Sequence, residues 1–233
     1  MTTPSGQISL DNVNTELDIS PGTQINMGAT AVRALAEVPS GAIAMSNLQG
    51  KSNAQFIVAS GGSVSTVGDY KVHIFTSSSN FVVSQGGNAA GSNAVDYFVV
   101  AGGGGGGGGI GGQPNFWFGA GGGGGGGFRE SVPSPAAWTG SPLANSGGAT
   151  PVSAQTYPVT IGGGGTGAQA STPSNAPNDN GGDGSNSVFS SITSAGGGGG
   201  AGRGSPNAGR PGGSGGGGGG GGQAGAAGQG NSP

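Results

Sequence analysis

The chain has 233 residues, of which 61 are glycine, six are basic and nine are acidic, giving a formal net charge of −3. So few charged side chains favour neither electrostatic capture of nucleic acid nor disorder sustained by high net charge. The absence of cysteine excludes disulfide frameworks, thiolate zinc sites and cysteine nucleophiles. The first thirty residues show no signal peptide pattern, and no apolar stretch approaches transmembrane length.

Short helices are expected near the amino terminus. Ser9 and Asn12 are suited to cap a short turn around residues 13–17, and the stretch ATAVRALAE at 29–37 predicts a helix ended by Pro39. A further helical turn is expected at 42–49. Each piece is too short to be stable alone, so these segments need a surface to pack against.

A group of strands is expected next. The segments 55–60, 69–77, 80–85 and 94–102 carry β-branched and aromatic residues, bounded by glycine, serine and asparagine. Within 70–75 the even-numbered residues should face one side and the odd-numbered residues the other. These segments predict a small antiparallel β unit.

Glycine usage changes near residue 96, where we place a domain junction, since only 11 of the 61 glycines lie in residues 1–96. The glycine tracts are 102–109, 119–127, 162–167, 196–204 and 212–222. Without Cβ atoms, threefold extended helices can pack at backbone distance, which predicts a polyglycine II helix bundle. A flexible linker is the alternative.

Aromatic side chains interrupt the glycine tracts. Phe116, Trp117, Phe118, Phe128 and Trp138 cluster on two loops, where a disordered chain would be depleted of aromatics. They either cap the glycine-rich region or present a binding surface. Both interpretations remain open from the sequence.

Catalytic and cofactor motifs are not indicated. Glycine runs match the dinucleotide fingerprint automatically, and the GKS at 50–52 has Met45 where a phosphate loop needs glycine. His73, the single histidine, fits a half-buried strand residue better than a catalytic or metal-binding one. Asp179 and Asp183 lie in a turn-rich polar loop, where a solvated turn is favoured over a calcium site. We therefore expect no enzyme activity, no cofactor and no metal.

The quoted motifs resemble a known family. GQISLDNVNTEL, followed by TQINMGATAVRALAEVPSGAIAMSNLQGKS, is similar to the amino-terminal module of bacteriophage tail-fibre and related virion proteins. YKVHIFTSSSNFVVSQGGNAAGSNAVDYFVVAGGGGGGGG and YPVTIGGGG resemble the glycine-rich fibre domain. Such domains commonly close with a strand after the last glycine run; none follows here, so the domain closes differently or the chain continues past residue 233.

This resemblance implies a fold class and a domain plan. The fold would be mostly irregular and β: a short helical virion-attachment module at 1–52, a β connector at 53–101, and a glycine-rich polyglycine II domain with exposed loops at 102–233. In the tip adhesins of T-even-like phages, loops between glycine tracts contact the host receptor. The implied protein is a tail-fibre or tail-tip adhesin in the virion, extracellular after release.

The same resemblance implies partners and candidate contacts. Residues 1–52 would bind other phage tail proteins, the loops would bind a host outer-membrane protein or glycan, and a homo-oligomer, a trimer, is expected. The candidate loops are 110–118, 128–147, 168–180 and 203–211. Their candidate receptor-binding residues are Asn115, Phe116, Trp117, Phe118, Phe128, Arg129, Trp138, Asn175, Asn178, Asp179, Arg203, Asn207 and Arg210.

Two other function classes remain open. A virion structural or connector protein without a receptor role would carry the same amino-terminal module. An extracellular ice-binding or matrix protein would also use glycine tracts, but it predicts a flat face of regularly spaced alanine or threonine and a secretion signal, and the sequence shows neither.

Overall fold

A computed structural model describes residues 2–113, 116–132, 144, 148–169, 179–203, 208–220 and 224–228, and it gives only the backbone for 110–113 and 116–118. The chain forms two compact units. The first comprises Met1–Ala59, Val83–Ala94 and Pro151–Gln155. The second comprises Ser60–Val82, Val95–Thr150 and Thr156–Pro233.

Regular secondary structure is short throughout the described residues. The helical elements are α1 (Leu10–Glu16), α2 (Thr30–Ala36) and the 3₁₀ turn η1 (Met45–Leu48). The strands are β1 (Ile57–Ser60), β2 (Ser63–Val67), β3 (Tyr70–Ile74), β4 (Ser79–Gly86), β5 (Ala94–Val95), β6 (Phe98–Val100), β7 (Ile110–Gln113), β8 (Phe116–Phe118), β9 (Phe128–Glu130), β10 (Thr150–Pro151), β11 (Thr156–Thr160), β12 (Ser187–Phe189) and β13 (Ile192–Ser194).

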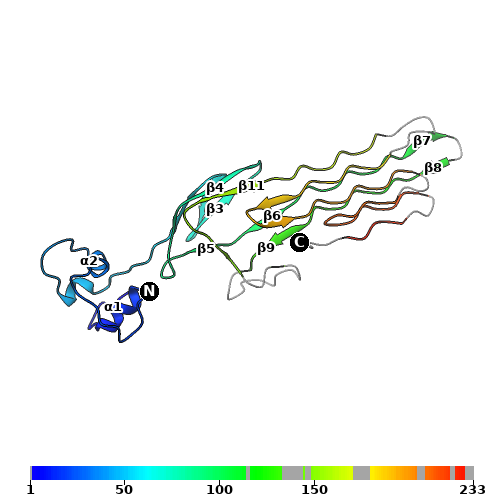
Figure 1. Cartoon of the computed structure of the whole chain (residues 1–233). Helices are drawn as coiled ribbons and strands as arrows, with labels where there is room; N and C mark the ends of the chain where they lie inside the picture. The colour runs from blue at the N-terminus through cyan, green and yellow to red at the C-terminus, as the bar shows by residue number, and fades with distance from the viewer. Residues whose placement is uncertain are drawn as a thin grey trace. The chain divides into compact units, whose positions relative to one another are not determined.

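The strands form one larger sheet and four two-stranded pairs. The larger sheet has five strands in the order β1-β4-β11-β12-β13, and the pairs are β10-β5, β2-β3, β6-β9 and β7-β8. Each strand pairing whose register the structure gives is antiparallel. Figure 1 shows the glycine tracts as long extended segments between β6 and β9 at one end and β7 and β8 at the other.

The first unit has a small apolar core. Val13, Val32, Leu35, Ala36 and Leu48 are buried together, one from α1, three from α2 and one from η1. Each short helix therefore packs its apolar side against the others, which compensates for helices too short to persist alone. The predicted need for a packing surface is confirmed within the chain.

Helix limits in this unit follow local signals. The Ser9 side chain accepts from the Asn12 backbone N–H at 3.2 Å, and Asn12 Oδ1 accepts from the Ser9 backbone N–H at 2.8 Å. This reciprocal capping starts α1 at Leu10, so the turn predicted at 13–17 is a helix that begins earlier. The predicted helix at 29–37 is confirmed as α2, which ends where Glu37 takes a left-handed backbone conformation with φ of 57°.

The second unit has an aromatic core on the sheet that contains β4, β11 and β12. Phe81, only 6% exposed, lies with its ring centroid 6.3 Å from that of Tyr157 and 6.0 Å from that of Phe189. The antiparallel register places Tyr157 opposite Phe81, so the two rings belong to one cross-strand pair. His73 adds an edge contact to Phe81 at 5.1 Å.

The hairpin β2-β3 confirms the prediction for His73 and contains one strand, β2, that the sequence did not predict. His73 is a partly buried strand residue, as predicted, and its Nδ1 lies 2.9 Å from the carbonyl oxygen of Gly61. The sequence does not predict β2, because SVSTV resembles a polar loop in composition. Its five residues pair with β3 from Ser63 opposite Ile74 to Val67 opposite Tyr70, so tertiary pairing overrides weak local propensity.

The fold class predicted for residues 102–233 is wrong. In place of a polyglycine II helix bundle, the regular structure of the described residues there is antiparallel strand, and the helical elements of the described chain are α1, α2 and η1. The glycine tracts are extended segments that continue flanking strands: the first lies between β6 and β7, and the second between β8 and β9. The physical reason is that each glycine tract continues from a paired strand. The antiparallel strands β6 and β9 therefore set the extended conformation and direction of the tracts attached to them. The mostly irregular and β character of the prediction partly fits.

Candidate recognition site at one end of the glycine tracts

Backbone hydrogen bonds join the glycine tracts at intervals of three residues. The Gly104 N–H donates to Gly124 O at 2.7 Å, and the Gly107 N–H donates to Gly121 O at 2.8 Å. Residue numbers rise along the first tract while those of its partners fall along the second tract. The two tracts are therefore antiparallel neighbours. The tracts are therefore held by main-chain bonds rather than by side-chain packing.

The fourth tract, 196–204, is central to this arrangement. Its residues 196–202 are all buried. The Gly197 N–H donates to Gly102 O at 2.8 Å, while Gly197 O accepts from the Gly184 N–H at 2.8 Å and Gly198 O accepts from the Gly124 N–H at 2.8 Å. The fourth tract thus bonds to at least three neighbouring segments, and only glycine lets backbones approach this closely on several sides.

Three of the four predicted loops have a root at the same end of these tracts. The Gly108 N–H donates to Asp179 O at 2.6 Å, and Gly108 O accepts from the Arg203 N–H at 3.2 Å. The second tract begins alongside, because the Gly107 N–H donates to Gly121 O at 2.8 Å. The roots of loops 110–118, 168–180 and 203–211 therefore lie together, at the end where Figure 1 shows β7 and β8. We call this end the recognition end.

The fourth predicted loop, 128–147, begins at the opposite end. Its first residues form β9, in which Phe128 pairs with Val100 and Arg129 with Val99 of β6. The Ser131 hydroxyl donates to Asp96 Oδ1 at 2.8 Å, which fixes the chain just after β9. The first residues of this loop thus lie at the other end of the tracts from the three roots described above (Figure 1).

The structure describes some of the predicted receptor-binding residues fully, some by their backbone alone, and others not at all. Phe128 and Arg129 are partly buried in β9, and the Arg129 Nε donates to Thr193 O at 3.1 Å. The backbone of β8 carries three of the predicted aromatics: Phe116, Trp117 and Phe118. Five predicted contacts lie outside the described residues: Asn115, Trp138, Asn175, Asn178 and Asn207.

The remaining three predicted contacts make ion pairs. The Arg203 Nε lies 3.0 Å from Asp179 Oδ2, and the Arg210 guanidinium lies 3.2 Å from Asp183 Oδ2. The first pair is nearly buried, with side-chain exposures of 13% and 5% for Arg203 and Asp179. The aspartates weighed as a calcium loop are thus engaged by arginines, and no group of three metal-ligating side chains occurs in the described ranges.

A ladder of side-chain acceptors was missed by the sequence analysis. Asn180, Asp183 and Asn186 each accept, through Oδ1, a backbone N–H from the fourth tract, at 2.7, 2.9 and 2.9 Å respectively. The donors are Gly202, Gly199 and Gly196. The signal was present in the sequence as a spacing of three residues between acceptors, matched to a spacing of three between glycines.

Removing one acceptor of this ladder should destabilise the second unit. In Asn180→Ala the buried Gly202 N–H loses its partner, and an unsatisfied buried donor costs about 1–3 kcal/mol. Urea unfolding of Asn180→Ala and wild type would measure this loss. Asn180→Asp, which keeps the acceptor oxygen, is the matched control, and equal losses in both variants would contradict the assignment.

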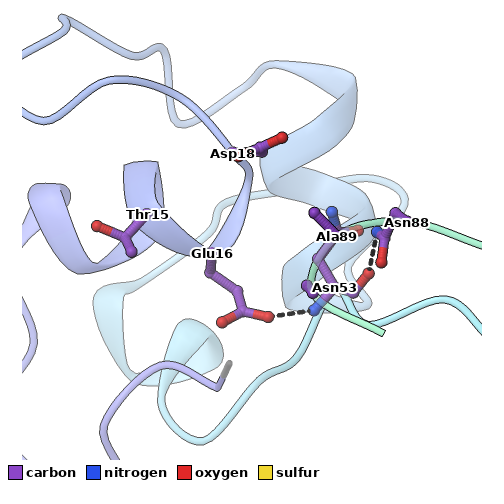
Figure 2. Close-up of a pocket in the computed structure, with 7 residues that line it drawn as sticks. Thr15, Glu16, Asp18, Asn53, Asn88 and Ala89 are labelled. Atoms are coloured by element: carbon purple, nitrogen blue, oxygen red, sulfur yellow. Dashed lines mark hydrogen bonds between the residues drawn. The ribbon is translucent and has the colours of Figure 1, made fainter. Parts of the chain in front are cut away.

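The first unit contains a hollow lined by the described residues Thr15, Glu16, Asp18, Asn53, Asn88, Ala89 and Ala90. Figure 2 shows the Glu16 carboxylate accepting from the Asn53 backbone N–H, at 2.7 Å, and the Asn88 side chain donating to Asn53 O, at 2.8 Å. Asn88 Oδ1 also accepts from the Gln55 N–H at 2.9 Å. These groups are occupied in holding the chain at 53–55, which is a structural role.

Comparisons with known proteins support the glycine-rich assignment. A family model described as a glycine-rich domain matches residues 76–233, about two thirds of the chain. Neither the curated proteins nor the solved structures include a significant match to the chain. Among the described residues, no helix has the length and apolar character needed to cross a lipid bilayer.

Proposed function

The chain belongs to the glycine-rich domain family, and from that premise we propose that it is a phage tail-fibre or tail-tip adhesin which binds a host cell-surface receptor. The observation that carries this proposal is the recognition end, where the roots of three loops lie together. Binding residues are commonly carried by loops that a rigid scaffold positions. The bonded glycine tracts supply that scaffold here, with Gly108 joined to both Asp179 and Arg203.

The proposed mechanism is reversible adhesion without chemistry on the receptor. The loops at the recognition end would contact an outer-membrane protein or glycan, with aromatic residues of β8 as anchors, since aromatics are enriched at interface hot spots. Because the chain carries only six basic and nine acidic residues, we expect adhesion to depend little on salt.

The part of the first unit formed by residues 1–52 is proposed to attach the protein to other tail proteins. Its small core and capped short helices form a compact element, and its amino-terminal sequence carries the resemblance to virion modules. A homotrimer is part of the same proposal. Assembly would further stabilise a unit whose own core is small.

Immunogold labelling of particles from the source culture tests the proposal. Antibody against residues 168–180, which include one root of the recognition end, is expected to label tail or fibre ends. Antibody against residues 1–52 serves as the matched control and should label the same particles at tail structures. Label confined to cell envelopes or free fibrils would instead favour an extracellular ice-binding or matrix protein.

Exchange of loop sequence separates the adhesin from a virion connector without a receptor role. Replacing residues 170–178 and 204–207 with those of a related phage is expected to transfer host range. Unchanged host range in particles that assemble normally would favour the connector.

A further inference from the structure

We propose that the Asp179–Arg203 ion pair is a latch that holds three loop roots together, so that the recognition end presents one composite surface rather than three independent loops. This inference rests on the proposed function for its biological meaning. It turns two predicted contact residues into positioning residues. Asp179 lies where loop 168–180 ends, and Arg203 lies where loop 203–211 begins.

Burial makes the pair sensitive to the loss of either charge. The Arg203 Nε lies 3.0 Å from Asp179 Oδ2, and the side chains are 13% and 5% exposed. A buried charge is costly unless it is paired and hydrogen-bonded, so Asp179→Asn removes the charge that compensates the Arg203 guanidinium. Separation of the roots would return that guanidinium to water, so we expect this variant to favour the open arrangement.

Backbone contacts join this pair to the third root. Gly108, which leads into β7, donates its N–H to Asp179 O at 2.6 Å and accepts the Arg203 N–H at 3.2 Å. Asp179 also lies directly against the fourth tract, because a Cβ placed on Gly202 would come within 2.5 Å of the Asp179 Cβ. The ion pair thus closes a ring of contacts that includes the roots of loops 110–118, 168–180 and 203–211.

A second ion pair provides an internal comparison. The Arg210 guanidinium lies 3.2 Å from Asp183 Oδ2, but these side chains are 49% and 43% exposed. Exposed pairs contribute little because water and salt screen them. Asp183→Asn is therefore a matched control for Asp179→Asn, since both changes remove one negative charge and keep the side-chain shape.

Trypsin provides a direct measurement of the latch. Arg203 is followed by glycine and is a cleavage site, whereas Arg210 is followed by proline and resists cleavage. In the wild-type full chain the buried Arg203 should be protected. In Asp179→Asn we expect cleavage after Arg203 to become at least about tenfold faster, because cleavage follows the population of the open form. Asp183→Asn should match wild type.

The distance between roots gives an independent measurement. The chain has no cysteine, so Gln169→Cys and Ala208→Cys can carry spin labels at two exposed root positions. A narrow distance distribution is expected with Asp179 present, and a broader one in Asp179→Asn. An unchanged distribution together with unchanged cleavage would overturn the proposal. So would simultaneous cleavage at Arg129 and Lys71, which would show general unfolding instead of opening at the roots.

Neither trypsin cleavage nor the spin-label distance uses host cells. The latch and the adhesin function can therefore be refuted independently of each other. An adhesin without a latch would label at tail ends yet show no effect of Asp179→Asn on cleavage or distance. A latch in a protein with another function would show both effects while the antibody labels no virion.

Discussion

Gly200→Ala is expected to lower the free energy of unfolding of the second unit by at least about 3 kcal/mol, the upper part of the range for overpacked sites. Gly200 is buried in the central tract, and a Cβ there would lie 2.1 Å from Gly121 O and 2.7 Å from Gly121 C. The clashing atoms are main chain, so no rotamer change can relieve the contact. The neighbouring tract must move, which strains the bond from the Gly121 N–H to Ala201 O.

Gly122→Ala is the matched control, and it should shift stability in the opposite direction. Gly122 is exposed in the second tract, and nothing lies within 4 Å of a Cβ built on it. Its φ is not left-handed, so alanine fits, and the change should stabilise by about 0.4–1 kcal/mol through the unfolded chain. Urea unfolding of both variants would measure the two shifts. Equal shifts would show that close packing of the tracts does not limit stability.

Local signals explain why the first unit was predictable. Ser9, Asn12 and Pro39 mark helix ends through chemistry that acts within a few residues, and α1 and α2 lie close to the expected positions. The strands β3 and β4 also carry their own β-branched and aromatic residues. In these segments local propensity agrees with the final structure, which is what makes an element recognisable from sequence.

The glycine-rich half was not predictable in the same way. A glycine tract has no side-chain pattern, so its structure is decided by which segments it meets, and those contacts are long-range. Gly105, for example, donates to Gly182 O and accepts from the Gly200 N–H, partners that lie far along the chain. The short strands β12 and β13 were missed because three residues each carry too little pattern, although they pair with each other and with β11.

The sequence predicted part of the candidate site. Loop sequences between tracts were identifiable from their proline, asparagine and aromatic content, but sequence does not specify the end of the tracts from which each loop leaves. Asp179 and Arg203 were predicted as receptor contacts because they lie in loops that the family resemblance assigns to the receptor. The burial of Arg203 and Asp179 instead depends on a contact 24 residues apart in sequence.

Leu48→Ala is expected to unfold the first unit selectively. Leu48 is fully buried, and it shares a core with only four other buried residues, Val13, Val32, Leu35 and Ala36. Truncating a buried leucine costs about 2–5 kcal/mol, and a core this small leaves little reserve.

Tryptic mapping separates unfolding of this unit from general instability. Arg33 and Lys51 lie in the first unit, so cleavage after them should accelerate in Leu48→Ala while cleavage after Arg129 in the second unit stays slow. Leu10→Ala is the control, because Leu10 is 45% exposed and its truncation should change stability by less than about 0.5 kcal/mol. Acceleration at all sites together would mean that the two units unfold as one, and the glycine tracts would then depend on the amino-terminal core.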